Sequence, residues 1–194
     1  GTQYTARLAG TITATGDGQQ LGSDVTWSFT TDACPCSLLG SLAPQSGGNP
    51  TQDGRWSGAP YTYEMGLRVQ VARTARLVAF RYYRDPGETG SHVGHLWAAD
   101  GTPLATVAFS GETASGWQEQ ALPAVVSLAP GTTYVVSVNR NDLYGFTPGG
   151  LAVQLASGPL RSLVGQNGVY ALTAGAFPTL SYNSANYFTD LVVQ

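Results

Sequence analysis

The stretch from Leu77 to Gln118, LVAFRYYRDPGETGSHVGHLWAADGTPLATVAFSGETASGWQ, decides the expected fold. Runs rich in β-branched and aromatic residues alternate in it with turns that contain Gly, Asp and Pro. It reads as strand, loop, strand, turn, strand, loop, strand, and it contains both histidines and two of the four tryptophans. We therefore place it at the centre of an antiparallel β-sandwich that the rest of the chain completes.

Composition supports an all-β, extracellular protein. The 194 residues suffice for one substantial domain, and a hydrophobic content of 42% allows a real core. Only 11% of the residues are charged, while 25 glycines and 11 prolines supply turns. A net charge of −3 without a basic run argues against nucleic acid as a partner. No apolar run approaches the roughly 18 residues of a membrane span. We expect a secreted or cell-surface protein whose signal sequence lies upstream of Gly1.

From Tyr61 onward, short strands follow one another at regular spacing, and no longer window carries a helical apolar stripe. This pattern predicts a β-sandwich of jelly-roll type over residues 61–194. The expected strands are 63–71, 76–84, 93–98, 103–109, 117–122, 124–128, 133–139, 151–155, 169–172 and 187–193.

Residues 32–60 are rich in Gly, Ser, Pro and Asn and show no periodicity, which predicts a linker or a long loop. Trp56 in this loop is interpreted as a cover for the core in preference to a ligand platform. Cys34 and Cys36 also lie here. A pair this close favours a local disulfide, with free thiols and metal or redox chemistry as the alternatives.

Residues 1–31 contain two expected strands, 3–8 and 24–31, and the second alternates apolar with polar residues. The segments YTARLAG (4–10) and SDVTWSFTT (23–31) resemble the last two strands of bacterial immunoglobulin-like domains, with Ser23 where those often have Gly. Such a sandwich needs roughly 100 residues. The resemblance therefore implies an incomplete, two-stranded immunoglobulin-like remnant ahead of the sandwich.

A second resemblance rests on motifs spread over roughly residues 34–194. They are CPCS (34–37), MGLRV (65–69), AFRYYRD (79–85), ETGSHVGHLWAADGTPLATVAFSGETASGWQ (88–118), TTYVVSV (132–138) and NYFTDLVV (186–193). As a set they resemble a bacterial family of secreted domains of unknown function. Its members typically carry an Asn-Thr-Gly-Thr-His-Thr-Gly loop, which 88–94 matches with three substitutions. The resemblance implies a β-sandwich that often follows immunoglobulin-like domains, and a carbohydrate-binding accessory role.

Strand alternation places a polar and aromatic set on the side away from the core. In 76–84, we expect Val78, Phe80 and Tyr82 to face the core. If three of the expected strands lie in one sheet, its opposite face carries Arg81, Tyr83, His95, Trp97 and Asn139. Flat aromatic rings pack against the apolar face of a pyranose, and Arg or amide groups bind its hydroxyls. The set therefore predicts a sugar site.

Structural roles compete with this interpretation. Trp97 is more often a core residue than a platform, and Arg81 is equally well explained by an ion pair with Glu64 or Glu112. His92 is expected to hold its Gly-rich loop through backbone hydrogen bonds. Binding residues concentrate on loops that a rigid scaffold carries. The loop expected after residue 139 supplies further ligand-binding candidates, namely Asn139, Arg140, Asn141 and Tyr144.

A structural calcium ion is the cation most compatible with oxygen-rich loops on an extracellular sandwich. The available acidic ligands are Asp85, Glu88, Asp142 and Asp190, although no ligand spacing singles them out. No cofactor is required by any motif.

Catalytic signatures are absent from the sequence: it has no Gly-x-Ser-x-Gly elbow, no His-Glu-x-x-His motif and no phosphate loop. We expect a non-catalytic module that binds a polysaccharide or cell-wall glycan within a larger secreted bacterial protein. The alternative is a structural spacer or adhesion module that acts through protein contacts. In that case residues 1–31 would mediate self-association through their strands.

Overall fold

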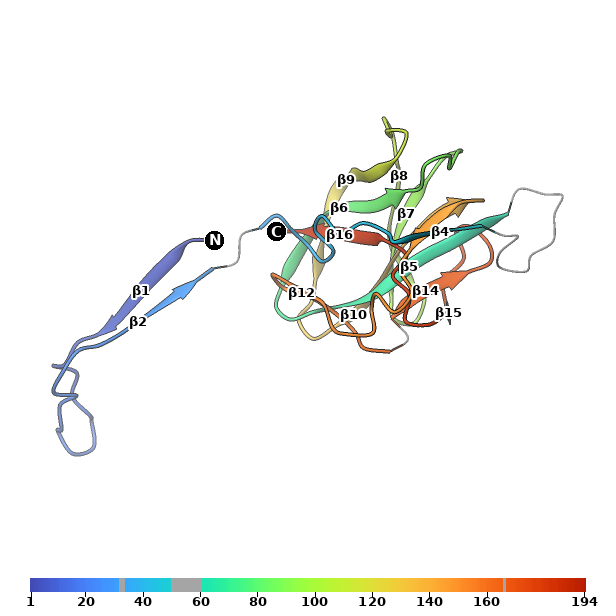
Figure 1. The fold of residues 1–194 in the computed structure, drawn as a ribbon. Coiled ribbons are helices and arrows are strands. Elements are labelled where there is room, and N and C mark those ends of the chain that lie inside the picture. The colour runs from blue at the N-terminus through green and yellow to red at the C-terminus, as the bar shows by residue number, and fades with distance from the viewer. Residues whose placement is uncertain (32–33, 50–60, 166) are drawn as a thin grey trace. The chain divides into compact units, whose positions relative to one another are not determined.

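The computed structural model describes residues 1–31, 34–49, 61–165 and 167–194, and its regular structure consists of β-strands (Figure 1). The chain divides into two compact units, Gly1–Cys34 and Pro35–Gln194. Within the described ranges, no helix is long and apolar enough to cross a membrane.

The first unit is an antiparallel hairpin of β1 (Gln3–Leu8) and β2 (Val25–Thr30). Its two faces differ completely, because residues that are opposite in the register have the same polarity. Thr5 and Ser28 share a hydrogen bond of 3.0 Å on the polar face. The apolar face carries Tyr4, Ala6, Leu8, Val25, Trp27 and Phe29. The five large side chains on this face are between 43% and 51% exposed.

The second unit contains two antiparallel sheets. The larger sheet has the order β12 (Ala156–Ser157), β13 (Leu160–Ser162), β5 (Thr62–Val71), β10 (Thr133–Asn141), β7 (Val93–Ala98) and β8 (Pro103–Ala108). The short strand β14 (Gly168–Ala171) follows β13 along the same edge of β5 and pairs in turn with β15 (Leu180–Ser181).

The smaller sheet has the order β3 (Cys36–Ser37), β16 (Thr189–Val193), β6 (Ala75–Arg84) and β9 (Gly116–Leu128). A separate two-stranded ribbon pairs β4 (Ser46–Gly48) with β11 (Tyr144–Phe146). Consecutive strands from β5 to β7 and from β8 to β10 cross between the two sheets. These crossings are the connections on which jelly rolls are built, and the expected antiparallel β-sandwich is confirmed.

The core lies between the two sheets. Leu67, Val69 and Val71 of β5 point into it, and so do Val136 and Val138 of β10. The smaller sheet contributes residues that are fully buried: Leu77, Phe80, Tyr82, Leu191 and Val193. Burial of such side chains stabilises the fold by roughly 2 kcal/mol each.

Three local expectations about strands are wrong, each for a physical reason. A register shift between Leu77 and Ala79 buries Leu77 and leaves Val78 only half-buried. The segment 151–155 is not a strand: it follows directly on a turn at residues 148–151, in which Gly149 adopts a φ of 67°, and it continues as a bend and irregular backbone. The two strands expected around Pro123 form one strand, β9. It lies at a sheet edge, where the missing proline N–H has no partner to lose.

Part of the segment expected to be a linker or a long loop belongs to the sandwich. It supplies β3 and β4, and Leu38 and Leu39 are buried in the core. The backbone N–H groups of both leucines donate to the Asp190 carboxylate at 3.0 and 2.9 Å. Cys34 and Cys36 are disulfide-bonded to each other. Residues 50–60, with Trp56, lie outside the described residues.

Asp190 should make stability depend on pH. Burial raises its pKa to about 6 in spite of the three backbone donors and Arg81. Between about pH 4 and about pH 6, Asp190 is therefore protonated in the folded protein, whereas it is ionised in the unfolded chain, where its pKa is near 3.8. Stability is fully present below about pH 4 and falls as the pH rises to about 6, by about 3 kcal/mol at most.

Urea unfolding of the wild type and of Asp190→Asn at several pH values measures this effect. The wild type should lose stability relative to the variant as the pH rises, because the amide does not titrate. An unchanged difference across that range would show that the carboxylate stays ionised in the folded protein.

Candidate functional site

A cleft of about 820 Å³ opens where the first residues of β5 meet β14 and the β4–β11 ribbon. Its volume falls within the range of about 300–1,000 Å³ that is typical of ligand sites. The described residues that line it are mainly aromatic: Ser46, Gly47, Gly48, Tyr63, Met65, Tyr144, Phe146, Tyr170, Leu172, Tyr182 and Tyr187.

Interlocked tyrosine rings form the floor of the cleft. The Tyr63 and Tyr144 rings meet edge to face with 5.6 Å between their centroids, and Tyr187 packs against Tyr144 at 6.1 Å. Tyr170 continues the row at 6.0 Å from Tyr187. Edge-to-face packing of this kind adds about 0.5–1.5 kcal/mol per pair beyond simple burial, so the floor is rigid.

Glycine at position 48 allows the ribbon to lie against this floor. Gly48 faces Tyr144 in the register of β4 and β11. A Cβ atom at Gly48 would clash with the Tyr144 ring, and one at Gly145 would stand 2.5 Å from Cγ of Pro44. The sequence therefore supplies glycine on both strands where backbone and rings approach most closely.

Backbone strain is concentrated around the cleft. Asp142, Asn183, Ser184 and Phe188 adopt left-handed φ values of 67°, 50°, 47° and 51°. Among the described residues, these are all the non-glycine residues with positive φ, and each lies within two positions of a cleft residue. Such conformations cost about 1–3 kcal/mol each and tend to cluster at functional sites.

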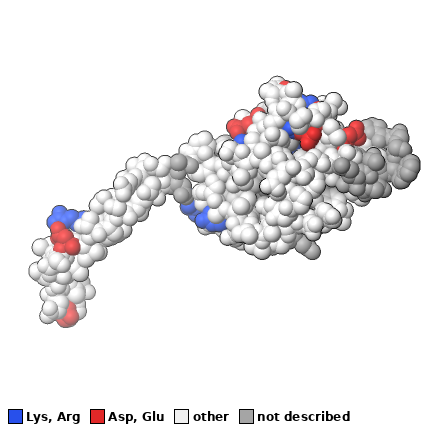
Figure 2. Space-filling view, in the orientation of Figure 1, with Lys and Arg blue, Asp and Glu red and all other residues white. Residues whose placement is uncertain are grey.

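The cleft changes in character from floor to rim. Tyr63, Tyr144 and Tyr187 are buried, whereas Tyr182 is 60% exposed and offers its ring to solvent. The described lining contains no Asp, Glu, Arg or His side chain. In the view of Figure 2, charged side chains of the second unit lie along its upper margin and in a basic group at its lower left, and large uncharged areas lie between them. The cleft therefore presents aromatic faces and hydroxyls to a ligand.

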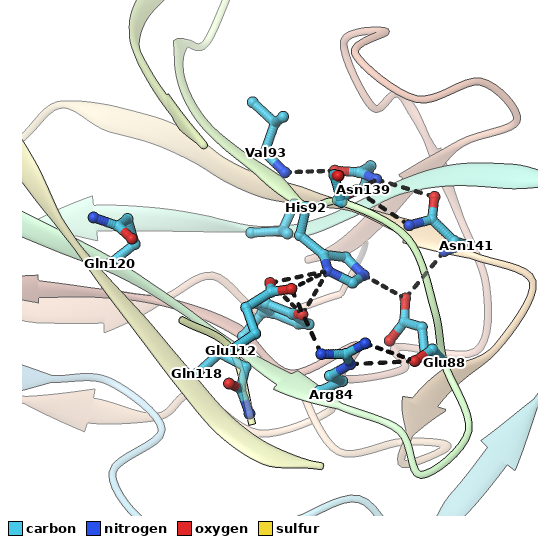
Figure 3. Close-up of polar contacts among 12 residues, drawn as sticks. Arg84, Glu88, His92, Val93, Glu112, Gln118, Gln120, Asn139 and Asn141 are labelled. Carbon is cyan, nitrogen blue, oxygen red and sulfur yellow. Dashed lines mark hydrogen bonds and ion pairs between the residues drawn. The ribbon is translucent and has the colours of Figure 1, made fainter. Parts of the chain in front are cut away.

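A separate, buried polar network surrounds His92 (Figure 3). The Nε2 atom of His92 lies 3.0 Å from Oε1 of Glu88, and Nδ1 lies 2.9 Å from Oε1 of Glu112. The Tyr82 hydroxyl donates to Glu112 at 2.8 Å, and burial together with this bond raises the pKa of Tyr82. The expectation that His92 holds its loop through backbone hydrogen bonds is wrong, because its ring binds two carboxylates.

Arg140 lies beside this network and is fully buried. Its guanidinium stacks on the Tyr82 ring at 4.6 Å and donates to the carbonyl of Tyr187 and the hydroxyl of Thr189 at 3.2 and 3.0 Å. Burial lowers the pKa of Arg140, and the negative charge of Glu88 opposes this shift. Arg140 therefore ties cleft residue Tyr187 to the centre of the sandwich.

A second polar cluster lies on the outer face of the larger sheet. Oε1 of Glu64 accepts a hydrogen bond from Ser137 at 2.6 Å and lies 3.0 Å from Nδ1 of His95. The Trp97 indole donates to Ser137 at 2.8 Å and meets the Phe177 ring edge to face. Strand alternation correctly placed His95 and Trp97 away from the core. However, Trp97 is only 6% exposed beneath its neighbours.

The expected polar and aromatic face does not form as one surface, because its residues lie on two sheets. Arg81 and Tyr83 belong to β6 in the smaller sheet, whereas His95, Trp97 and Asn139 belong to the larger one. Arg81 instead stacks on the Trp117 indole at 4.4 Å and pairs with Glu119 and Asp190 at 3.3 and 3.8 Å. The Tyr83 ring packs edge to face on Trp117.

The loop candidates also differ from expectation, because β10 extends to Asn141. Asn139 is 7% exposed and Arg140 is fully buried, so neither is a loop residue open to solvent. Asn139 and Asn141 bind the 89–91 loop, both through the carbonyl of Ser91. Of this set, Tyr144 alone lines the cleft.

The acidic residues considered for calcium do not form one site, although Asp85 and Glu88 are near neighbours. Asp85 packs near Gly47, Glu88 faces His92, and Asp142 accepts from the backbone of Tyr61 at 2.8 Å. Asp190 binds backbone N–H groups in the core. Over the part of the chain that the structure describes, no three His, Cys, Asp or Glu residues are arranged to hold a metal ion.

Comparison with protein families assigns most of the second unit to a known family. A family model described as "Domain of unknown function (DUF4082)" matches residues 49–189. The chain belongs to this family. The DUF4082 match includes β5 and all cleft residues except Ser46, Gly47 and Gly48 of β4. A search of the curated proteins finds no match.

Sequence reasoning missed most of the cleft. Tyr63, Tyr170 and the pair Tyr182 and Tyr187 come from three separate segments of the chain, and of these tyrosines only Tyr187 lies in one of the family motifs, NYFTDLVV (186–193). The available signal was the concentration of tyrosine at strand ends, as in YTY (61–63) and in SYNSANYF (181–188).

We expect His92 to be essential for stability. His92→Leu fills a similar volume but leaves two carboxylates without their partner, so the free energy of unfolding should fall by about 3–5 kcal/mol in urea denaturation. Adding Glu88→Gln should recover part of this loss, because it removes one uncompensated charge. Glu119→Gln is the surface control, with an expected loss below about 1 kcal/mol. Similar losses for His92→Leu and the surface control would contradict a structural role for the network.

Proposed function

We propose that the Pro35–Gln194 unit is a non-catalytic carbohydrate-binding module of a larger secreted bacterial protein, and that its ligand occupies the tyrosine cleft. The observation that carries this proposal is the cleft itself, in which five tyrosines and Phe146 are gathered at one opening. Residues of this kind otherwise require burial or a partner, and here Tyr182 remains 60% exposed.

The chemistry of the lining suits a sugar. The apolar face of a pyranose packs on aromatic rings, while tyrosine hydroxyls and the backbone of β4 can exchange hydrogen bonds with sugar hydroxyls. The rigid floor keeps the ordering cost of binding low. The described lining contains no carboxylate, imidazole or thiol, which favours binding over acid–base or nucleophilic chemistry.

Two further observations support the secreted location and the choice of the cleft as the site. The disulfide between Cys34 and Cys36 is typical of an oxidising compartment outside the cytoplasm. Left-handed backbone within two residues of cleft positions is typical of a site whose geometry is maintained for function.

Tyr182→Ala tests the proposal, since this exposed ring contributes little to the core. A polysaccharide screen by affinity electrophoresis identifies a ligand, and titration calorimetry then compares the variants. We expect Tyr182→Ala to weaken binding at least tenfold, about 1.4 kcal/mol, with the thermal midpoint unchanged. Tyr4→Ala, which removes a similarly exposed tyrosine from the first unit, should bind as the wild type does. Equal losses in both variants, or no glycan bound by the wild type, would refute the proposal.

The alternative function, adhesion through protein contacts, is supported by the hairpin of the first unit. Its apolar face carries no charge, and a two-stranded hairpin alone is at best marginally stable in water. We propose a second copy of the same face as its occupant, because an uncharged apolar surface is complementary to itself.

Sedimentation of the full chain over a range of concentrations tests self-association. We expect Trp27→Ser to shift the chain towards monomer, because it removes a large apolar side chain from the face. Thr26→Ser on the polar face is the matched control and should behave as the wild type. A wild-type chain that is monomeric throughout would rule out this alternative and leave the cleft proposal untouched.

A further inference from the structure

We infer that the cleft selects uncharged glycans and discriminates against polysaccharides that carry carboxylate, sulfate or phosphate groups. This inference rests on the proposed function and specifies its ligand class. It begins from the eleven described lining residues, among which there is no arginine or histidine to pair with an anion. An anionic group buried there would lose water without gaining a counter-charge, at a cost of several kcal/mol.

The aromatic walls add to this discrimination. The face of an aromatic ring carries negative electrostatic potential, which attracts the C–H groups of a neutral pyranose and repels an anion. Tyr144 and Phe146 lie side by side with their centroids 5.7 Å apart, and the exposed ring of Tyr182 also lines the cleft. A neutral sugar can use these surfaces, whereas a negatively charged group finds no favourable place on them.

The charged groups next to the cleft also disfavour an anionic ligand. A Cβ atom on Gly47 would lie 3.3 Å from Oδ2 of Asp85, so a carboxylate packs against this lining residue. Burial and the charge of Glu88 raise the pKa of Asp85, which indicates that further negative charge is already disfavoured there. Arg140 binds the carbonyl of Tyr187 but is fully buried, with Glu88 opposing its charge. It therefore presents no guanidinium to a ligand.

Matched polymer pairs test the inference, because each pair shares one backbone and differs mainly in charge. The probes are polygalacturonate with its methyl ester and carboxymethyl cellulose with hydroxyethyl cellulose, alongside a glycan array that contains neutral and anionic chains. We expect binding to be confined to uncharged chains, with at least a tenfold preference wherever both members of a pair can be compared. The affinity should change less than twofold between about 0.02 M and about 0.5 M NaCl, because no ion pair is involved.

Introducing a cation provides the reciprocal test. Ser46→Arg places a guanidinium at the exposed rim and should raise the affinity for an anionic chain at least fivefold, while Ser46→Gln, the uncharged control, should not. The inference would be overturned by a preference for anionic chains or by a steep loss of affinity with salt. It would also be overturned if choline competed at the cleft, because aromatic rings would then be binding a quaternary ammonium ion. Each of these results would still leave a binding site at the cleft. Failure of every glycan to bind would overturn the proposed function, and the inference with it.

Discussion

The sandwich depends on a cation placed at the end of its core. Arg140 continues the inward-facing row of Val136 and Val138 on β10, where an apolar residue would be expected. Its guanidinium stacks on Tyr82 of the smaller sheet and donates to residues that lead into β16. One side chain therefore joins the two sheets to the floor of the cleft. Such a group is stable in the interior only because carbonyls, a hydroxyl, an aromatic face and Glu88 surround it.

The network around His92 extends this arrangement to the loops. Glu88 binds the His92 ring and the backbone N–H of Asn141, while Arg84 binds the carbonyl of Glu88. Charged groups that are individually expensive to bury become a crosslink between β6, the 85–92 loop and the end of β10 (Figure 3). The crosslink therefore holds the backbone of Asn141 in place, directly before the left-handed residue Asp142 and the cleft residue Tyr144.

The sequence predicted the strands and their faces better than it predicted the site. Val136 and Val138 of the expected strand 133–139 face the core, and the same alternation would have placed Arg140 inward had that strand been extended by one residue. Side-chain period cannot tell which sheet a strand joins, so Arg81 and His95 were grouped although pairing separates them. The cleft required knowledge of how β4 pairs with β11 and β14 with β5, and these pairings join residues far apart in the chain, such as Gly48 with Tyr144 and Leu67 with Gly168.

The margins of the sheets bear on how such a unit behaves beside other chains. One edge of β5 is covered by two short strands, β13 and β14, and the free edge of the smaller sheet is interrupted by Pro123 in β9. At these two margins an incoming extended chain therefore finds few consecutive backbone N–H and C=O groups in register. Both features limit amyloid-like strand addition at these margins.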